Sequence, residues 1–249
     1  MTGNLTKSQS KYIKSLQQKK YRERYGQFVI EGEKILEEAL AERYSLEYIV
    51  TTGEDVSIPD RFSGDVFHTD TKIFSSLSTQ KTPSGLLGVC RMAQDRTPDT
   101  ATPILALDSV SDPGNLGTLI RLCDWFGIKQ MFCGEGTVDV YNPKVVQATM
   151  GSIFRVAFSR GSIETFIEEN SAQRPVIAAD MNGEPIYSFP FPENFVLIMG
   201  SESHGPSERV LQLASHSITI PKFGQSESLN VAVAAGIILS EFRRQVPRL

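Results

Sequence analysis

Short apolar runs alternate with amphipathic segments along most of the chain, and this alternation predicts an α/β fold. In the second half, each apolar run has the length of a buried strand and is followed by a segment with helical spacing. We expect strands near 104–107, 129–133, 155–158, 176–180, 195–199 and 217–220. Strands that alternate with helices form a mostly parallel sheet, which helices cover on both faces.

The first hundred residues predict a smaller α/β domain of their own. A basic helix opens the chain, and a second helix is expected from Glu33 to Arg43. Apolar, β-branched runs predict strands over 28–30, 48–51 and 86–91.

A polar segment from Gln94 to Pro103, rich in Thr, Asp and Pro, separates the two halves and indicates a linker. The 249 residues are enough for two domains, and a hydrophobic content of 40% supports a packed core. We therefore predict one domain over 1–95, a linker over 96–103 and a second domain over 104–249.

In the second half, the predicted strand over 104–107 runs into a polar loop and then into an amphipathic helix. The loop contains Pro-Gly-Asn, which predicts a turn that includes Asn115. The helix behind this turn carries Arg121 and is closed by Gly127.

Two later strands end in the same way. After the first of them, Glu202 lies between Gly200 and Gly205. The second is stopped by Pro221, and Ser228 stands where an N-cap is expected before a helix rich in Ala and Val. Open α/β sheets bind ligands at the carboxyl ends of their strands. Three such loops therefore predict one shared site.

Composition excludes several other classes of protein. The longest apolar stretch, Val231 to Leu239, is well short of the roughly 20 residues that a membrane span needs. Cys90, Cys123 and Cys133 lack the spacing of a metal site or a disulfide framework, so we expect reduced packing residues and no metal. These features predict a cytoplasmic protein without a membrane partner.

Charge is uneven along the chain. The net charge is −4, but residues 1–24 contain seven Lys or Arg and one Glu. A local basic segment can bind phosphates on an acidic protein, because salt screens charges beyond about 8 Å. Tyr12 and Tyr21 lie within this segment, Tyr25 directly follows it, and all three could stack on unpaired bases. Charge alone favours a solvated helix that docks through Tyr12, Ile13 and Leu16 over an RNA contact.

Three motifs in order resemble those of the SpoU family, the TrmH-like RNA ribose 2′-O-methyltransferases of the SPOUT superfamily. They are Asn115 with Arg121, the Gly-x-Glu-x-x-Gly of Gly200–Gly205, and the Ile-Pro…Ser-Leu-Asn-Val of residues 220–231. The resemblance covers about residues 103–245, and the three motifs together are specific. It implies a C-terminal trefoil knot, which the apolar pattern would not predict, since knots are almost absent from proteins.

The resemblance also implies S-adenosylmethionine as cofactor. Its expected binding positions are Met199, Gly200, Gly205, Ile220, Pro221 and Leu229. The expected catalytic positions are Asn115, Arg121, Glu202, Ser228 and Asn230.

Physical chemistry questions the base role that family accounts give to Arg121. A guanidinium stays protonated and offers donors but no acceptor, so it is a poor base. Our hypothesis is that Arg121 holds a phosphate and stabilises charge on the 2′-oxygen, while Glu202 or a water takes the proton. Each residue also has a structural explanation: Asn115 as a turn former, Ser228 as a helix cap, Asn230 as a loop brace, Glu202 as a charge favoured near the N-terminus of the following helix, and Arg121 as a surface ion pair.

The resemblance extends to partners. The N-terminal half resembles, on its Phe-Val-Ile-Glu-Gly-Glu-Lys run, the L30e-like RNA-binding domain of many relatives, which favours ribosomal RNA over transfer RNA. It also implies a homodimer whose site is shared between subunits. Gln147 and Lys222 depart from the family pattern, where Arg and Met are expected.

Other functions remain open at this point. A nicotinamide dehydrogenase is disfavoured, because no Gly-x-Gly-x-x-Gly follows the first strand of the sheet and a P-loop is absent from the sequence. A transfer RNA methyltransferase is one alternative. A non-catalytic RNA-binding or ribosome-assembly protein is another, and it need not bind S-adenosylmethionine.

Overall fold

The computed structural model describes residues 2–53 and 58–247, which form two compact units. The first unit contains the residues up to Gln94 and also Asp139–Arg155. The second contains Asp95–Val138 and the residues from Val156 onward. The first boundary lies close to the expected one, but the segment 139–155 was expected in the C-terminal domain and packs with the N-terminal residues.

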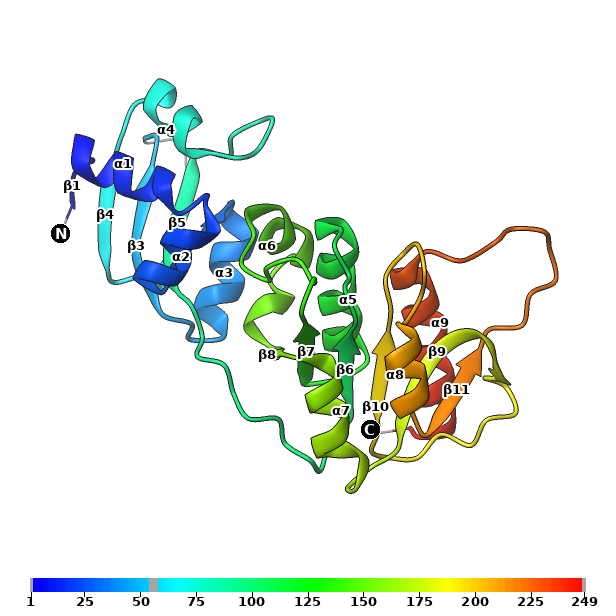
Figure 1. Ribbon diagram of the computed structural model, residues 1–249. Helices are drawn as coiled ribbons and strands as arrows, with labels where there is room; N and C mark the ends of the chain where they lie inside the picture. The colour runs from blue at the N-terminus through cyan, green and yellow to red at the C-terminus, as the bar shows by residue number, and fades with distance from the viewer. Residues whose placement is uncertain (1, 54–57, 248–249) are drawn as a thin grey trace. The chain divides into compact units, whose positions relative to one another are not determined.

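The first unit is built on a five-stranded mixed sheet of order β1-β4-β3-β5-β2 (Figure 1). Strands β2 and β3 pair antiparallel with β5, whereas β3, β4 and β1 run parallel to one another. The strands are β1 (Thr2–Asn4), β2 (Gln27–Glu31), β3 (Leu46–Thr51), β4 (Asp65–His68) and β5 (Leu86–Arg91). The sequence pattern missed β1 and β4, which are short and partly exposed.

The helices of the first unit are α1 (Lys7–Ser15), α2 (Lys19–Tyr25), α3 (Glu33–Ala41), α4 (Thr71–Leu77) and α6 (Pro143–Thr149), followed by the short 3₁₀ helix η1 (Ser152–Phe154). Thr6 and Gln9 form a capping box that starts α1. Helices α1 and α4 cover a core to which Ile13, Leu16 and Phe74 contribute fully buried side chains. The docking of the basic segment through Ile13 and Leu16 is thus confirmed.

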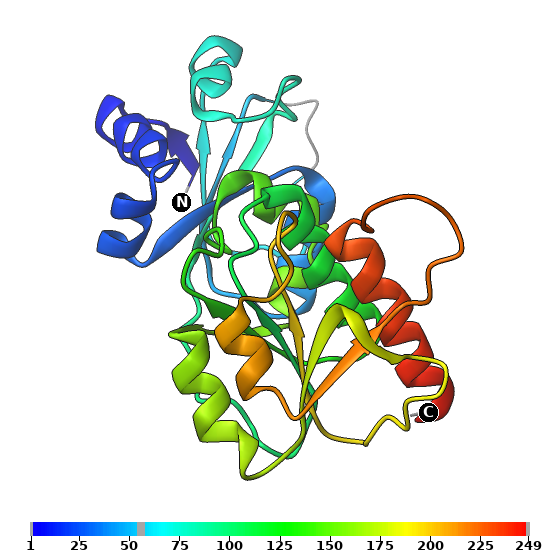
Figure 2. The ribbon, with the colours of Figure 1, turned by 45° about the vertical axis from the view of Figure 1, so that its right-hand side comes forward.

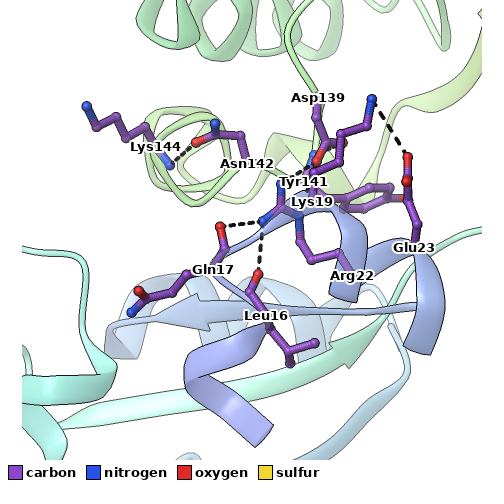
Figure 3. A network of polar contacts seen from close by, with 9 residues as sticks. All are labelled: Leu16, Gln17, Lys19, Arg22, Glu23, Asp139, Tyr141, Asn142 and Lys144. Carbon is purple, nitrogen blue, oxygen red and sulfur yellow. Dashed lines mark hydrogen bonds and ion pairs between the residues drawn. The ribbon is translucent and has the colours of Figure 1, made fainter. Parts of the chain in front are cut away.

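The basic segment forms two helices and not one, because the backbone turns between Leu16 and Gln18. The Arg22 guanidinium donates to the carbonyl oxygens of Leu16 and Gln17, each at 2.9 Å, and so satisfies groups that the end of α1 leaves exposed. It also pairs with Asp139, with Nη2 at 2.5 Å and Nε at 3.1 Å from Oδ2 (Figure 3). The side chains of Arg22 and Asp139 are only 3% and 7% exposed.

This ion pair joins the segment 139–155 to the N-terminal helices within the first unit. The Tyr141 ring packs on Phe28 at 4.7 Å between centroids, and α6 lies against β2. Arg155 forms ion pairs with Glu38 and Glu42 of the region of α3. Gln147, one of the two departures from the family pattern, accepts a hydrogen bond from Gln80 at 3.1 Å. Gln147 therefore belongs, with Gln80, to the first unit.

The second unit contains a six-stranded sheet of order β11-β9-β10-β6-β7-β8, and all its pairings are parallel. The strands are β6 (Ile104–Leu107), β7 (Gln130–Gly134), β8 (Ala157–Gly161), β9 (Val176–Pro185), β10 (Val196–Met199) and β11 (His216–Thr219). The expected parallel α/β sheet is confirmed. The trefoil knot stays a prediction.

Helices cover this sheet in two pairs (Figures 1 and 2). The helices α7 (Ile163–Ser171) and α8 (Glu208–Leu213) pack on alternate residues of the central strands, such as Ile104 and Ile198. The helices α5 (Pro113–Trp125) and α9 (Val231–Gln245) lie side by side, and Arg243 of α9 donates to the carbonyl oxygen of Phe126 at 2.6 Å. Among the described residues, none of the helices combines the length and apolarity that crossing a membrane requires.

All three cysteines are buried in the structure. Burial raises the pKa of the Cys90 and Cys123 thiols, which therefore stay protonated at neutral pH. These two thiols behave as packing residues, as the sequence predicted.

The buried ion pair leads to a stability prediction. Replacing Arg22 by Met leaves the Asp139 carboxylate buried without its partner, and we expect the free energy of unfolding to fall by about 3–5 kcal/mol. Urea denaturation followed by circular dichroism measures the change. Arg24→Met is the matched control, since Arg24 is exposed and its loss should cost about 0.5 kcal/mol or less. Equal midpoints for the two variants would contradict the role assigned to Arg22.

Candidate active site

The site forms where three strand-to-helix connections of the second unit meet. Strands β6 and β10 are neighbours in the sheet, so the loops after Leu107 and Met199 leave the same edge side by side. The third connection leaves β11 at the far end of the sheet and returns because α9 packs against α5. The ligand-binding edge expected from the three loops is therefore assembled by helix packing as well as by strand order.

A chain of three polar side chains joins these connections. Asn230 donates from Nδ2 to Oδ1 of Asn115 at 2.8 Å. Asn115 in turn donates from Nδ2 to Oε1 of Glu202 at 2.9 Å. The sequence predicted each of these residues for the site, and the structure brings all three into contact.

The start of α9 decides which group donates and which accepts in each of these side-chain hydrogen bonds. Oδ1 of Asn230 accepts from the backbone N–H groups of Ala232 and Val233, at 2.9 and 3.3 Å. Its amide nitrogen must then point to Asn115, whose own amide nitrogen is left to face the Glu202 carboxylate. A helix N-terminus thereby orients a carboxylate in another loop.

The cap of α9 corrects one expectation. The helix begins at Val231 and its N-cap is Asn230, not Ser228. An N-cap must lie directly before the first helical residue to reach its N–H groups. Ser228 is exposed, and its carbonyl oxygen accepts from the Ser226 hydroxyl at 3.1 Å. Asn230, expected as a loop brace, is the cap as well.

The Pro-Gly-Asn sequence is likewise not a turn. Asp112 caps α5 by accepting from the Asn115 N–H at 2.8 Å, and Pro113 occupies the first helical position. Proline is favoured there because that N–H has no intrahelical partner. Asn115 is therefore held in the first helical turn, with its side chain directed at Glu202.

The loop that carries Glu202 is folded tightly on itself. Ser201 and Gly205 exchange two backbone hydrogen bonds of 3.0 Å, and Gly205 has a φ of +68°, which favours glycine. A Cβ on Gly200 would lie 1.9 Å from the carbonyl carbon of Gly205. Both glycines of the motif are thus required by the backbone.

Sequence reasoning missed Asp108, which follows β6 and is only 6% exposed. Its carboxylate accepts from the Ser207 N–H at 2.8 Å, and its own N–H donates to the Met199 carbonyl at 2.9 Å. Asp108 therefore fixes both ends of the loop that carries Glu202. The sequence did offer one sign of this role, because Asp108 is an acidic residue directly after a buried strand.

The loop between β11 and α9 has a different character. Within the described part of the chain, none of the backbone N–H groups of residues 220–229 donates a hydrogen bond. Ile220 and Pro221 are half-buried, whereas Lys222 and Leu229 are exposed. The expected cofactor position Met199 is buried and its carbonyl is already bonded, so it supports the site from beneath.

Arg121 stands apart from the chain of polar side chains. It lies on α5, six residues beyond Asn115, and is exposed. Among residues 2–53 and 58–247, no group forms a hydrogen bond or ion pair with its guanidinium. The alternative explanation of Arg121 as a surface ion pair therefore finds no support.

A groove of about 690 Å³ runs between α5 and α9 and begins at the polar chain. Asn115 and Asn230 lie at its end. The remaining walls are mostly apolar or small, from Thr118, Leu122, Tyr187, Ala232, Val233, Gly236, Ile237, Ser240 and Glu241. Arg121 is not among the residues that line the groove.

Comparison with known proteins assigns this fold and site to a class. Residues 102–240 match the SpoU rRNA Methylase family, and residues 7–88 match the MRM3-like substrate binding domain. The chain is 37% identical, with a TM-score of 0.87, to "a putative RNA methyltransferase of the TrmH family" from Porphyromonas gingivalis, covering 97% of this chain and 99% of that one. An AdoMet-bound rRNA methyltransferase from Sinorhizobium meliloti also gives a TM-score of 0.87, at 29% identity over 100% and 99% of the two chains.

The chain belongs to the SpoU rRNA Methylase family. A relative at full length is the 23S rRNA (guanosine(2553)-2′-O)-methyltransferase RlmP of Bacillus subtilis, 34% identical over 92% of this chain and 94% of the relative. The family expected from the three motifs, the SPOUT-type α/β fold and the RNA methyltransferase class are confirmed.

The residues present fit S-adenosylmethionine, the expected cofactor. The cofactor carries an amino acid and a nucleoside, which need both backbone donors and acceptors. The backbone N–H groups of residues 220–229 have no acceptor within the described part of the chain, and the loop over 200–205 presents glycines at close range. A loop of this kind can bind a polar ligand through its main chain.

Gly200 provides a test of this fit. An Ala at this position places its Cβ inside the backbone of Gly205 and Pro206, so the loop has to open. We expect S-adenosylmethionine binding to weaken by about tenfold or more, equivalent to about 1.4 kcal/mol, in isothermal titration calorimetry. Gly3→Ala, in the first unit and outside both loops, is the control, because a Cβ there meets nothing within 4 Å. Unchanged affinity in Gly200→Ala would exclude the 200–205 loop from the cofactor site.

Proposed function

We propose that this protein transfers a methyl group from S-adenosylmethionine to a ribose 2′-hydroxyl of ribosomal RNA. The observation that carries the proposal is the hydrogen-bonded chain from Asn230 through Asn115 to Glu202, which ties the three family motifs into one site. Two relatives support ribosomal RNA as the substrate. RlmP and RlmB of Neisseria meningitidis are both 23S rRNA methyltransferases, and RlmB is 31% identical over 57% of this chain.

In this mechanism the carboxylate of Glu202 receives the hydroxyl proton. Asn115 holds Oε1, and in the described part of the chain no group donates to Oε2, which is left to accept from the ribose. When bound, the cofactor supplies a methyl group on a positively charged sulfur. Transfer of that methyl group to the 2′-oxygen would break its bond to sulfur and release S-adenosylhomocysteine, and the hydroxyl proton would pass to Glu202 or to a water. The protein otherwise acts by alignment and by exclusion of water.

Arg121 acts by charge and not as a base. Its guanidinium has donors only, so it can hold a phosphate next to the target ribose and stabilise negative charge that develops on the 2′-oxygen. The absence of a protein partner for Arg121 among the described residues leaves its donors available to RNA. The exposed Ser228 is suited to contact the substrate or cofactor by a neutral hydrogen bond.

We further propose that the enzyme works as a homodimer. The position of Arg121 on α5, outside the polar chain of its own subunit, is consistent with a role at the partner's site. The apolar groove between α5 and α9 is suited to take a second copy of the same surface, as two-fold dimers require.

The first unit is proposed to bind the RNA substrate. Its match to the MRM3-like substrate binding domain supports this, as do the exposed cations of the two N-terminal helices, Lys7, Lys11, Lys14, Lys19, Lys20 and Arg24. Arg22 does not belong to that surface, because it is buried against Asp139. The cytoplasmic location expected from the sequence stays a prediction.

The test of the function is transfer of tritiated methyl from S-adenosylmethionine to ribosomal RNA and transfer RNA in separate reactions. We expect label in ribosomal RNA as a 2′-O-methylnucleoside, with little in transfer RNA. Arg121→Ala should abolish the label without loss of cofactor binding. Cofactor binding without label in either RNA would refute the proposed substrate, and absence of both would favour an assembly factor.

Replacing Glu202 by Gln isolates the carboxylate. The Gln side chain keeps an oxygen that can accept from Asn115, so the loops stay joined, but it cannot take a proton. We expect kcat to fall by about 100-fold or more. Glu208→Gln, on the exposed start of α8, is the control and should retain wild-type rates. A Glu202→Gln enzyme with the wild-type kcat would rule out the carboxylate as acceptor.

The dimer is tested at Val233, which is 52% exposed on the groove side of α9. Sedimentation should show a dimer for the wild type and a monomer for Val233→Arg, because a charge buried at an apolar interface costs several kcal/mol. Methyl transfer should fall with dissociation. A wild-type enzyme that is monomeric and fully active would contradict the dimer.

A further inference from the structure

The single tryptophan of the chain, Trp125, lies on the surface of the second unit. It is the last residue of α5, and 84% of it is exposed. Most large side chains in this unit are buried, and an exposed indole presents a wide apolar face to water. Such a side chain on a rigid helix is suited to contact a flat ligand.

Trp125 shares a helix face with Arg121. The two residues are four positions apart, so their Cβ atoms are about 5–6 Å apart and one turn separates them. Both are exposed, and neither lines the groove between α5 and α9. An aromatic face and a cation that has no ion-pair partner among the described residues are therefore exposed together.

Helix α9 holds the C-terminal end of α5, which carries Arg121 and Trp125. Arg243 donates from Nε to the Phe126 carbonyl at 2.6 Å and from Nη2 to the Gly127 carbonyl at 3.4 Å. These bonds satisfy carbonyl groups at the C-terminal end of α5. Trp125 is thus presented on an ordered helix end, which lowers the entropy cost of binding through it.

We propose that Trp125 stacks on an unpaired base of the RNA substrate next to the target nucleotide, while Arg121 binds the intervening phosphate. This inference rests on the proposed function and names the form of RNA that the site takes: a single-stranded or unstacked segment and not a paired helix. An aromatic ring beside a guanidinium offers the stacking face and the charge that an unpaired nucleotide needs. A second copy of the chain is the competing occupant, but the groove offers it a separate, more apolar surface.

Because Trp125 is the only tryptophan, its fluorescence reports on this position alone. The wild-type enzyme with S-adenosylhomocysteine is titrated with a short single-stranded oligoribonucleotide and with the same sequence in a duplex. We expect saturable quenching by the single strand and a much weaker response to the duplex. Emission that ignores single-stranded RNA while filter binding shows the complex would overturn the proposal, as would emission that depends only on protein concentration, which would place Trp125 between subunits.

Steady-state kinetics of methyl transfer to protein-free ribosomal RNA gives an independent measurement. Trp125→Ala should raise the KM for RNA by about 5- to 100-fold, the equivalent of one lost base stack, with little change in kcat. Trp125→Phe keeps a ring and should recover most of the affinity. Equal KM values for wild type and Trp125→Ala would overturn the inference.

Arg121→Ala separates this inference from the proposed function. If the wild type methylates RNA and Arg121→Ala does not, the function stands, and the Trp125 fluorescence and the Trp125 variants decide the inference. If the wild type transfers no methyl to any RNA, the proposed function fails, and the inference fails with it.

Discussion

The N-terminus of α9 is the point on which the site depends. Its first backbone N–H groups need an acceptor, and the Asn230 side chain supplies it. That single cap fixes which end of the Asn230 amide faces Asn115, and Asn115 then has only its N–H group to offer Glu202. Helix α9, which packs against α5, thereby orients the Glu202 carboxylate in the loop after β10.

A second constraint acts in the first unit, where a segment from the middle of the chain completes an N-terminal fold. Residues 139–155 leave the parallel sheet after β7 and return to it at β8, and in between they pack with the N-terminal residues. The buried pair of Arg22 and Asp139 is one of the contacts that hold this segment, together with the Tyr141–Phe28 ring contact. One of the seven basic residues of the N-terminal segment is therefore structural, and the remaining positive charge is what the surface can offer to RNA.

The sequence allowed most of the second unit to be predicted, because buried parallel strands are short apolar runs that stand out between helices. It was less successful where several explanations were physically equivalent. Ser228 and Asn230 are both good caps, and only the true start of α9 chooses between them. Pro-Gly-Asn suits a turn or a first helical turn, and Asp112 decides for the helix. The strands β1 and β4 escaped notice because their side chains are not fully buried.

The sequence by itself determined the α/β class, the three glycine-containing loops and the family, since these follow from local periodicity and from residues at fixed spacing. The tertiary structure decided which of the candidate residues meet. The hydrogen bond between Asn115 and Glu202 joins residues 87 positions apart, and the one between Asn115 and Asn230 joins residues 115 positions apart. The ion pair of Arg22 and Asp139 spans 117 positions. Contacts over such distances depend on how strands are ordered and helices packed, and no local pattern in the chain encodes them.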